Sequence, residues 1–109
     1  MANINDNSST DLTSVIRQYQ PNLTVYEDFY RDVHQHPELS GMESRTAAVV
    51  ASHLEALDFT VHLNIGGHGV VGLLENGPGK ILLIRAELDA LPTLEQTGLP
   101  YASKKEMVD

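Results

Sequence analysis

The residues of this chain best suited to chemistry follow a short aliphatic run. Residues 81–84 read Ile-Leu-Leu-Ile, which is typical of a strand that is buried on both faces of a sheet. Because side chains alternate along a strand, Arg85, Glu87 and Asp89 are expected on one side of its carboxyl end. Ligands of open α/β sheets bind at that end. Two carboxylates there suit a divalent cation or acid/base chemistry, and ion pairing with Arg85 is the plainer alternative that the pattern leaves open.

The segments that precede this run predict helices. Apolar residues recur at helical spacing over residues 23–33, and Pro37 should end that helix. A second helix is predicted after residues 40–43, where Ser-Gly-Met-Glu fits a capping box. Its exit falls at Asp58, where a left-handed backbone is usual. A weaker pattern predicts a short helix within residues 11–20.

Three strands are predicted next, over residues 60–64, 70–75 and 80–85. The turn sequence Asn-Gly-Pro-Gly at residues 76–79 predicts that the second and third strands form an antiparallel hairpin. The predicted fold class is therefore α/β, with helices first and then a three-stranded segment. We expect residues 1–22 to be a flexible tail with a short helix, and residues 23–109 to form the folded part.

Length and composition exclude several classes of protein. A chain of 109 residues is one small domain or part of a larger one. Its net charge of −8 repels phosphate, which argues against nucleic acid as a partner. We expect no membrane span, because no apolar run approaches the roughly 20 residues that one needs. The N-terminus lacks a signal-peptide pattern and the chain has no cysteine, so a cytoplasmic location is the default expectation.

Two other patterns resemble ligand sites but fit a structural role better. Residues 67–72, Gly-His-Gly-Val-Val-Gly, match a dinucleotide fingerprint, but they lead into a strand instead of a helix, so a tight turn is the better interpretation. His34, His36 and Glu38 lie close together around a predicted helix end and could suggest a metal site. Histidines in that place are expected to interact with the free carbonyls of the last helical turn instead.

Four segments of the chain occur in a characteristic order. They are residues 31–40 (Arg-Asp-Val-His-Gln-His-Pro-Glu-Leu-Ser), Glu43 with Thr46 and Ala47, residues 85–92 (Arg-Ala-Glu-Leu-Asp-Ala-Leu-Pro) and residues 95–103 (Glu-Gln-Thr-Gly-Leu-Pro-Tyr-Ala-Ser). Together they resemble the N-terminal part of the M20 metallopeptidase family. The closest branch contains the amidohydrolases that cleave N-acyl amino acids, such as hippurate and auxin–amino acid conjugates. The resemblance covers roughly residues 23–109, and it implies the N-terminal part of a mixed-sheet metallohydrolase catalytic domain.

The resemblance implies amide hydrolysis at two divalent metal ions, zinc or manganese, with a bridging water and a glutamate that carries the proton. Asp89 stands at the position of the family's orienting aspartate and is the candidate catalytic residue. Glu87 stands at the neighbouring metal-binding position, which holds His in wider members and usually Asp in this branch, and it is the candidate metal ligand. The implied substrate is a small N-acyl amino acid or a dipeptide-like molecule, and members of the family are often homodimeric.

The chain departs from the family in length. In this branch a His-Ala-Cys-Gly-His-Asp motif with metal ligands follows the Tyr-Ala-Ser segment, whereas this chain ends at Asp109. We therefore expect an N-terminal fragment of a metal-dependent amidohydrolase that is inactive by itself. The alternative is a short non-catalytic interaction module or pseudoenzyme derived from that family, acting through an exposed sheet edge. Hydrolysis by this chain alone is disfavoured, because a hydrolytic metal site needs about three protein ligands.

Overall fold

The computed structural model describes residues 11–106 and divides the chain into two units. Unit 1 is Met1–Tyr30 and unit 2 is Arg31–Asp109, so the division falls within a helix. Residues 1–10 of the flexible tail expected over residues 1–22 lie outside the described residues.

Two helices occupy the first part of the described chain. Helix α1 spans Leu12–Gln18 and is capped by Asp11, whose carboxylate accepts a hydrogen bond from the Thr13 amide at 3.1 Å. Helix α2 spans Leu23–Gln35 and ends two residues before Pro37, as the sequence predicts. Within residues 11–106, no helix combines the length and the apolar character that crossing a membrane requires.

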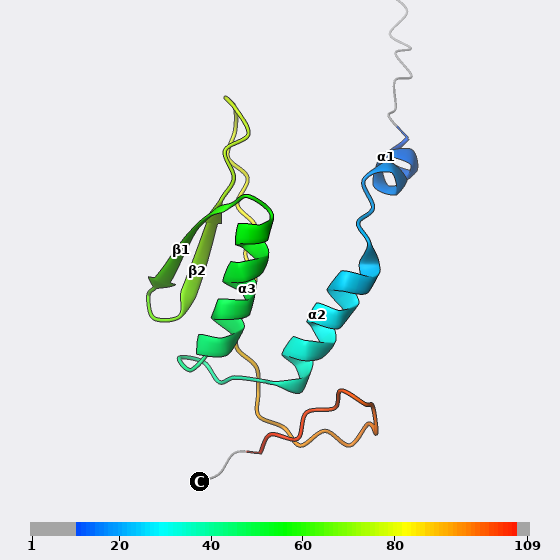
Figure 1. Ribbon diagram of the computed structural model, residues 1–109, viewed down its shortest axis with the longest axis vertical. Helices are drawn as coiled ribbons and strands as arrows, with labels where there is room; N and C mark the ends of the chain where they lie inside the picture. Colours follow the sequence, from blue (N-terminus) through cyan, green and yellow to red (C-terminus); the bar gives the residue numbers. More distant parts are fainter. Residues whose placement is uncertain (1–10, 107–109) are drawn as a thin grey trace, which may run out of the picture. The chain divides into compact units, whose positions relative to one another are not determined.

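Unit 2 contains one helix packed on a two-stranded antiparallel sheet. Helix α3 spans Ser44–Ala56, strand β1 spans Thr60–Ile65 and strand β2 spans Gly69–Leu73. Figure 1 shows α3 lying along the hairpin that β1 and β2 form. The order of helices before strands is confirmed, and the fold is mixed α/β. The buried apolar side chains of the described residues are small: Pro37, Ala47, Ala51 and Ala102.

Glycines make the β1–β2 hairpin possible. Gly66 and Gly67 have φ angles of 62° and 120°, which a side chain would oppose. They form the turn after Ile65, so the tight-turn interpretation of the glycine pattern is confirmed. Gly72 faces α3 so closely that a Cβ there would come within 3.0 Å of Leu54 Cδ1. The backbone at Asp58, where α3 gives way to β1, is left-handed with φ of 63°, as expected.

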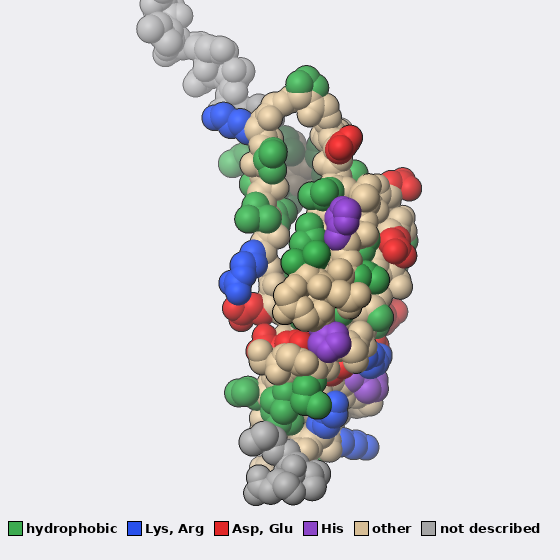
Figure 2. Space-filling view, turned by 90° about the vertical axis from the view of Figure 1, so that its left-hand side faces the viewer, with side chains coloured by type: hydrophobic (Ala, Val, Ile, Leu, Met, Phe, Trp, Pro, Cys, Tyr) green, Lys and Arg blue, Asp and Glu red, His purple; other side chains and the backbone are tan. Residues whose placement is uncertain are grey.

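The third predicted strand does not form. Residues 80–85 take no part in a sheet, and the described sheet holds β1 and β2 alone. The hairpin predicted at residues 76–79 was therefore wrong, and the chain forms its hairpin one connection earlier. The side chains of residues 81–84 are between 83% and 97% exposed instead of buried. Hydrophobic side chains accordingly stand at the molecular surface in Figure 2. A strand buried on both faces needs neighbouring strands and covering layers, and the described residues supply neither.

The start of α3 also differs from the prediction. The capping box would join Ser40 and Glu43, but Glu43 Oε1 accepts the Gly41 amide at 2.8 Å, and its side chain makes no cap bond to the helix. The carboxylate of Glu38 occupies the helix N-terminus instead, because the α2–α3 loop folds back toward α3. The predicted capping box is therefore absent, although the helix predicted after it is present.

Candidate functional site

A hollow of about 540 Å³ in unit 2 brings both candidate site residues together. Its walls come from the α2–α3 loop, the β1–β2 turn and the segment that follows the aliphatic run: Ser40, Gly41, Glu43, residues 65–69 and residues 85–89. Glu87 and Asp89 both line it, and both are exposed. The structure therefore places the two carboxylates at one hollow, while the roles assigned to them remain predictions.

The Arg85 side chain also reaches the hollow and pairs with one of the carboxylates. Its Nη2 atom lies 3.2 Å from Glu87 Oε1. The two side chains are 78% and 68% exposed, so water screens the pair and it contributes little to stability. Ion pairing with Arg85, the plainer alternative from the sequence, is therefore present at Glu87, and a role for this carboxylate in cation binding or acid/base chemistry stays a prediction.

The described residues do not compose a metal site by themselves. Among residues 11–106, no group of three or more His, Cys, Asp or Glu side chains is placed to hold a metal ion. His68, from the β1–β2 turn, lines the hollow with Glu87 and Asp89 but does not complete such a group. Any metal held at these carboxylates would need ligands from outside the described residues.

We expect the 109-residue chain to bind zinc or manganese weakly or not at all. Carboxylates from one short segment leave most of a coordination shell unfilled. Isothermal titration calorimetry, with metal-free buffer as the blank, measures this directly. Stoichiometric binding in the micromolar range would contradict the expectation.

His34, His36 and Glu38, which the sequence offered as a metal cluster, each contact a different partner. His34 Nε2 lies 2.7 Å from Glu95 Oε2, and His36 Nδ1 lies 2.7 Å from the carbonyl oxygen of Asp32 in the last turn of α2. Glu38 faces α3. The expected interaction with a helix-end carbonyl is confirmed for His36, whereas His34 pairs with a carboxylate instead.

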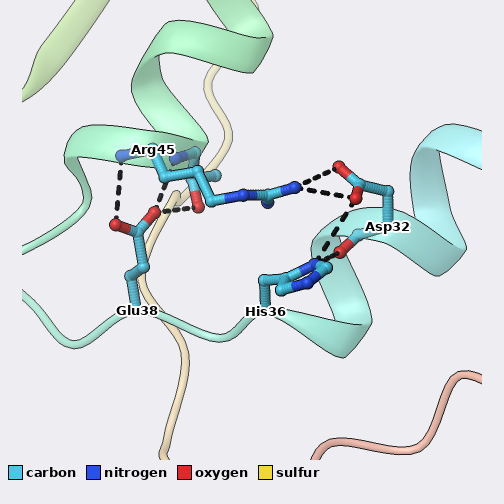
Figure 3. A network of polar contacts seen from close by, with 5 residues as sticks. Asp32, His36, Glu38 and Arg45 are labelled. Carbon is cyan, nitrogen blue, oxygen red and sulfur yellow. Dashed lines mark hydrogen bonds and ion pairs between the residues drawn. The ribbon is translucent and has the colours of Figure 1, made fainter.

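A polar network joins the end of α2 to the start of α3 (Figure 3). Arg45 Nη2 donates to both carboxylate oxygens of Asp32, at 2.7 and 2.8 Å. This hydrogen bond lowers the pKa of Asp32, with burial opposing it and the charges of Arg45 and His36 assisting. Both side chains are partly exposed, so water weakens their electrostatic attraction. The main effect of the network is to hold the end of α2 and the start of α3 in a fixed position relative to each other.

Glu38 satisfies the free amides at the N-terminus of α3. Its carboxylate accepts from the Arg45 amide at 3.0 Å, the Thr46 amide at 2.5 Å and the Thr46 hydroxyl at 2.6 Å. Burial raises the pKa of Glu38, but these three hydrogen bonds and the nearby Lys105 charge outweigh it, so the pKa is lowered. Sequence reasoning missed this cap. The available signal was an acidic residue in the loop that leads to a helix N-terminus.

Glu95 organises the segment after the hollow in a similar way. Its carboxylate accepts from the Ser103 amide at 2.9 Å and the Thr97 hydroxyl at 2.8 Å, and it pairs with His34. The Ser103 amide, the Thr97 hydroxyl and His34, in that order, lower the pKa of Glu95 to about 2 against the weaker effect of burial. Tyr101 stacks edge-on against the His34 ring at 5.6 Å.

The Glu95 contacts should be lost in acid. A carboxyl whose pKa is depressed in the folded state stabilises that state above its ordinary pKa of 4.5, and the contribution disappears as the pH falls towards about 2. We expect the Ser103 amide to lose protection from hydrogen exchange across this range. The substitution Glu95→Gln should remove the pH dependence, whereas Glu75→Gln, at an exposed position, should preserve it. A Ser103 amide that is equally protected at both ends of the range would refute this account.

Comparison with curated proteins finds sequence similarity to hydrolases. The hippurate hydrolase of Campylobacter jejuni is 44% identical over 84 residues, which are 76% of this chain and 22% of that protein. YhaA of Bacillus subtilis, named as an amidohydrolase, is 44% identical over 75 residues, or 68% of this chain and 19% of YhaA. The protein sll0100 of Synechocystis, named as a hydrolase, is 48% identical over 77 residues, with the same two shares of 68% and 19%.

The chain spans about a fifth of the length of these relatives. No family model matches it, and no solved structure does. The sequence similarity nevertheless covers more than two thirds of this chain in each case. The part of this chain that the relatives match is homologous to amidohydrolases, which confirms the recognition drawn from the four sequence segments.

Proposed function

We propose that this chain forms part of a metal-dependent amidohydrolase of the M20 type, which cleaves the amide bond of small N-acyl amino acids. In this proposal Asp89 orients a metal ligand and Glu87 contacts a divalent ion, zinc or manganese. The remaining ligands come from outside the described residues. The metal would polarise the acyl carbonyl and activate water. Without those ligands the chain is inactive. Its cytoplasmic location and a homodimeric state of the whole enzyme remain predictions of the same kind.

One observation carries the proposal. Glu87 and Asp89 line a single hollow, in a segment that resembles the family's metal-binding strand end. Both side chains are accessible to a ligand. The similarity to a hippurate hydrolase supports an N-acyl amino acid as the substrate class.

A hybrid enzyme tests the proposal. The matched residues of the Campylobacter jejuni hippurate hydrolase are replaced by those of this chain, and hydrolysis of N-benzoylglycine is measured with added zinc or manganese. We expect the hybrid to hydrolyse the substrate and the 109-residue chain to be inactive under the same conditions. A folded hybrid without activity would count against the proposal, as would activity of the 109-residue chain alone.

A non-catalytic interaction module is the second candidate, and one observation favours it. Residues 81–84 expose four consecutive aliphatic side chains on a segment outside the sheet. Such a segment can add to the sheet of another protein. Pull-down with the purified chain, combined with light scattering, tests this candidate. A stable monomer that captures nothing would speak against it.

A further inference from the structure

The loop between α2 and α3 contacts the candidate site through its backbone. The carbonyl oxygen of Glu38 accepts a hydrogen bond from the Ala90 amide at 2.8 Å. Ala90 directly follows Asp89, so this bond fixes the chain immediately beside a candidate site carboxylate. Residues 85–89 belong to no helix or strand, and this bond is therefore one of the constraints that place them.

The side chain of Glu38 holds the α2–α3 loop in place. The Glu38 carboxylate spans the Arg45 and Thr46 amides at the N-terminus of α3. A negative charge at that end is favoured by the helix dipole as well as by the free amides. The loop has a second anchor beside it, because Lys105 Nζ donates to the carbonyl of Pro37 at 3.0 Å.

We propose that Glu38 is a positioning residue, whose carboxylate fastens the loop to α3 and whose carbonyl thereby sets the position of the Glu87–Asp89 segment at the hollow. This inference rests on the proposed function for its significance, because it assigns those carboxylates to a site. The coupling itself is structural. It links the N-terminus of α3 to residues 87–89 through one residue that does not line the hollow.

Hydrogen exchange at the Ala90 amide tests the coupling in the 109-residue chain. Glu38→Ala removes the carboxylate and keeps the carbonyl, so an effect at Ala90 must pass through the loop. We expect Ala90 to exchange about tenfold faster, the size that loss of a helix cap gives, with a smaller effect in Glu38→Gln, which keeps one acceptor oxygen. The matched control is Glu55→Gln, since Glu55 is an exposed glutamate of α3 that does not line the hollow. The control should leave Ala90 unchanged.

A pH titration of the unaltered chain distinguishes coupling through Glu38 from a general loss of stability. The Ala90 amide resonance should shift as Glu38 takes up a proton, with a midpoint below the usual range for glutamate. That component should be absent in Glu38→Gln and present in Glu55→Gln, with the Val71 amide of the hairpin as the reference. An Ala90 resonance that titrates identically in Glu38→Gln would overturn the inference, as would unchanged exchange in Glu38→Ala. Neither measurement reads hydrolysis, so failure here and failure of the proposed function are separate outcomes.

Discussion

In the active hybrid, Asp89→Asn should lower kcat/KM for N-benzoylglycine by about 10-fold to 100-fold, the range typical of a carboxylate that orients a metal ligand. The substitution keeps the size of the side chain and removes the charge. Asp89 is exposed at the hollow, so the change should leave the fold intact and act on the site. Initial rates over a range of substrate concentrations give the value.

Asp58→Asn is the matched control for that experiment. Asp58 is also an exposed aspartate, and its left-handed backbone, with φ of 63°, suits Asn. It lies at the exit of α3 and does not line the hollow. We expect full activity from this variant. Equal activity of the Asp89 and Asp58 variants would remove Asp89 from the site.

The second large effect concerns Gly69, which opens β2 and lines the hollow. A Cβ at this position would collide with the carbonyl oxygen of Ile65, its partner in the strand register. The nearest atoms are the backbone carbonyl oxygen and carbon of Ile65, which leave little room to relax. We expect Gly69→Ala to reduce the free energy of unfolding of the 109-residue chain by about 1–3 kcal/mol, the cost of overpacking.

Urea unfolding followed by circular dichroism measures that loss, with Gly66→Asn as the control. Gly66 has φ of 62° and open space around it, and Asn tolerates that backbone better than most residues. Its substitution should cost about 1 kcal/mol at most, because Asn escapes part of the left-handed penalty and meets no neighbouring atoms. Equal stability of Gly69→Ala and the unaltered chain would show that the hairpin closes differently from the structure described here.

Local sequence signals predicted the elements that depend on local interactions. The end of α2 before Pro37, the tight turn at Gly67, and the left-handed Asp58 all follow from backbone preferences of the residues themselves. The family resemblance also brought Glu87 and Asp89 to attention, and the structure places both at one hollow.

Features that depend on distant partners could not be predicted in the same way. The cap of α3 comes from Glu38, eight residues before Thr46, and this contact exists only because the intervening loop folds back. The local capping-box pattern pointed to Ser40 and Glu43 instead. Residues 81–84 carry the composition of a buried strand, but strand formation requires pairing partners, which the described residues do not provide.

The affinity of the hybrid for zinc or manganese, measured by competition with a chelator of known affinity, tests the central claim most directly. If Glu87 and Asp89 belong to a hydrolytic metal site, Asp89→Asn should weaken metal binding by about 10-fold to 100-fold, and Asp58→Asn should leave it unchanged. Identical metal affinity in the hybrid and its Asp89→Asn variant would contradict the account.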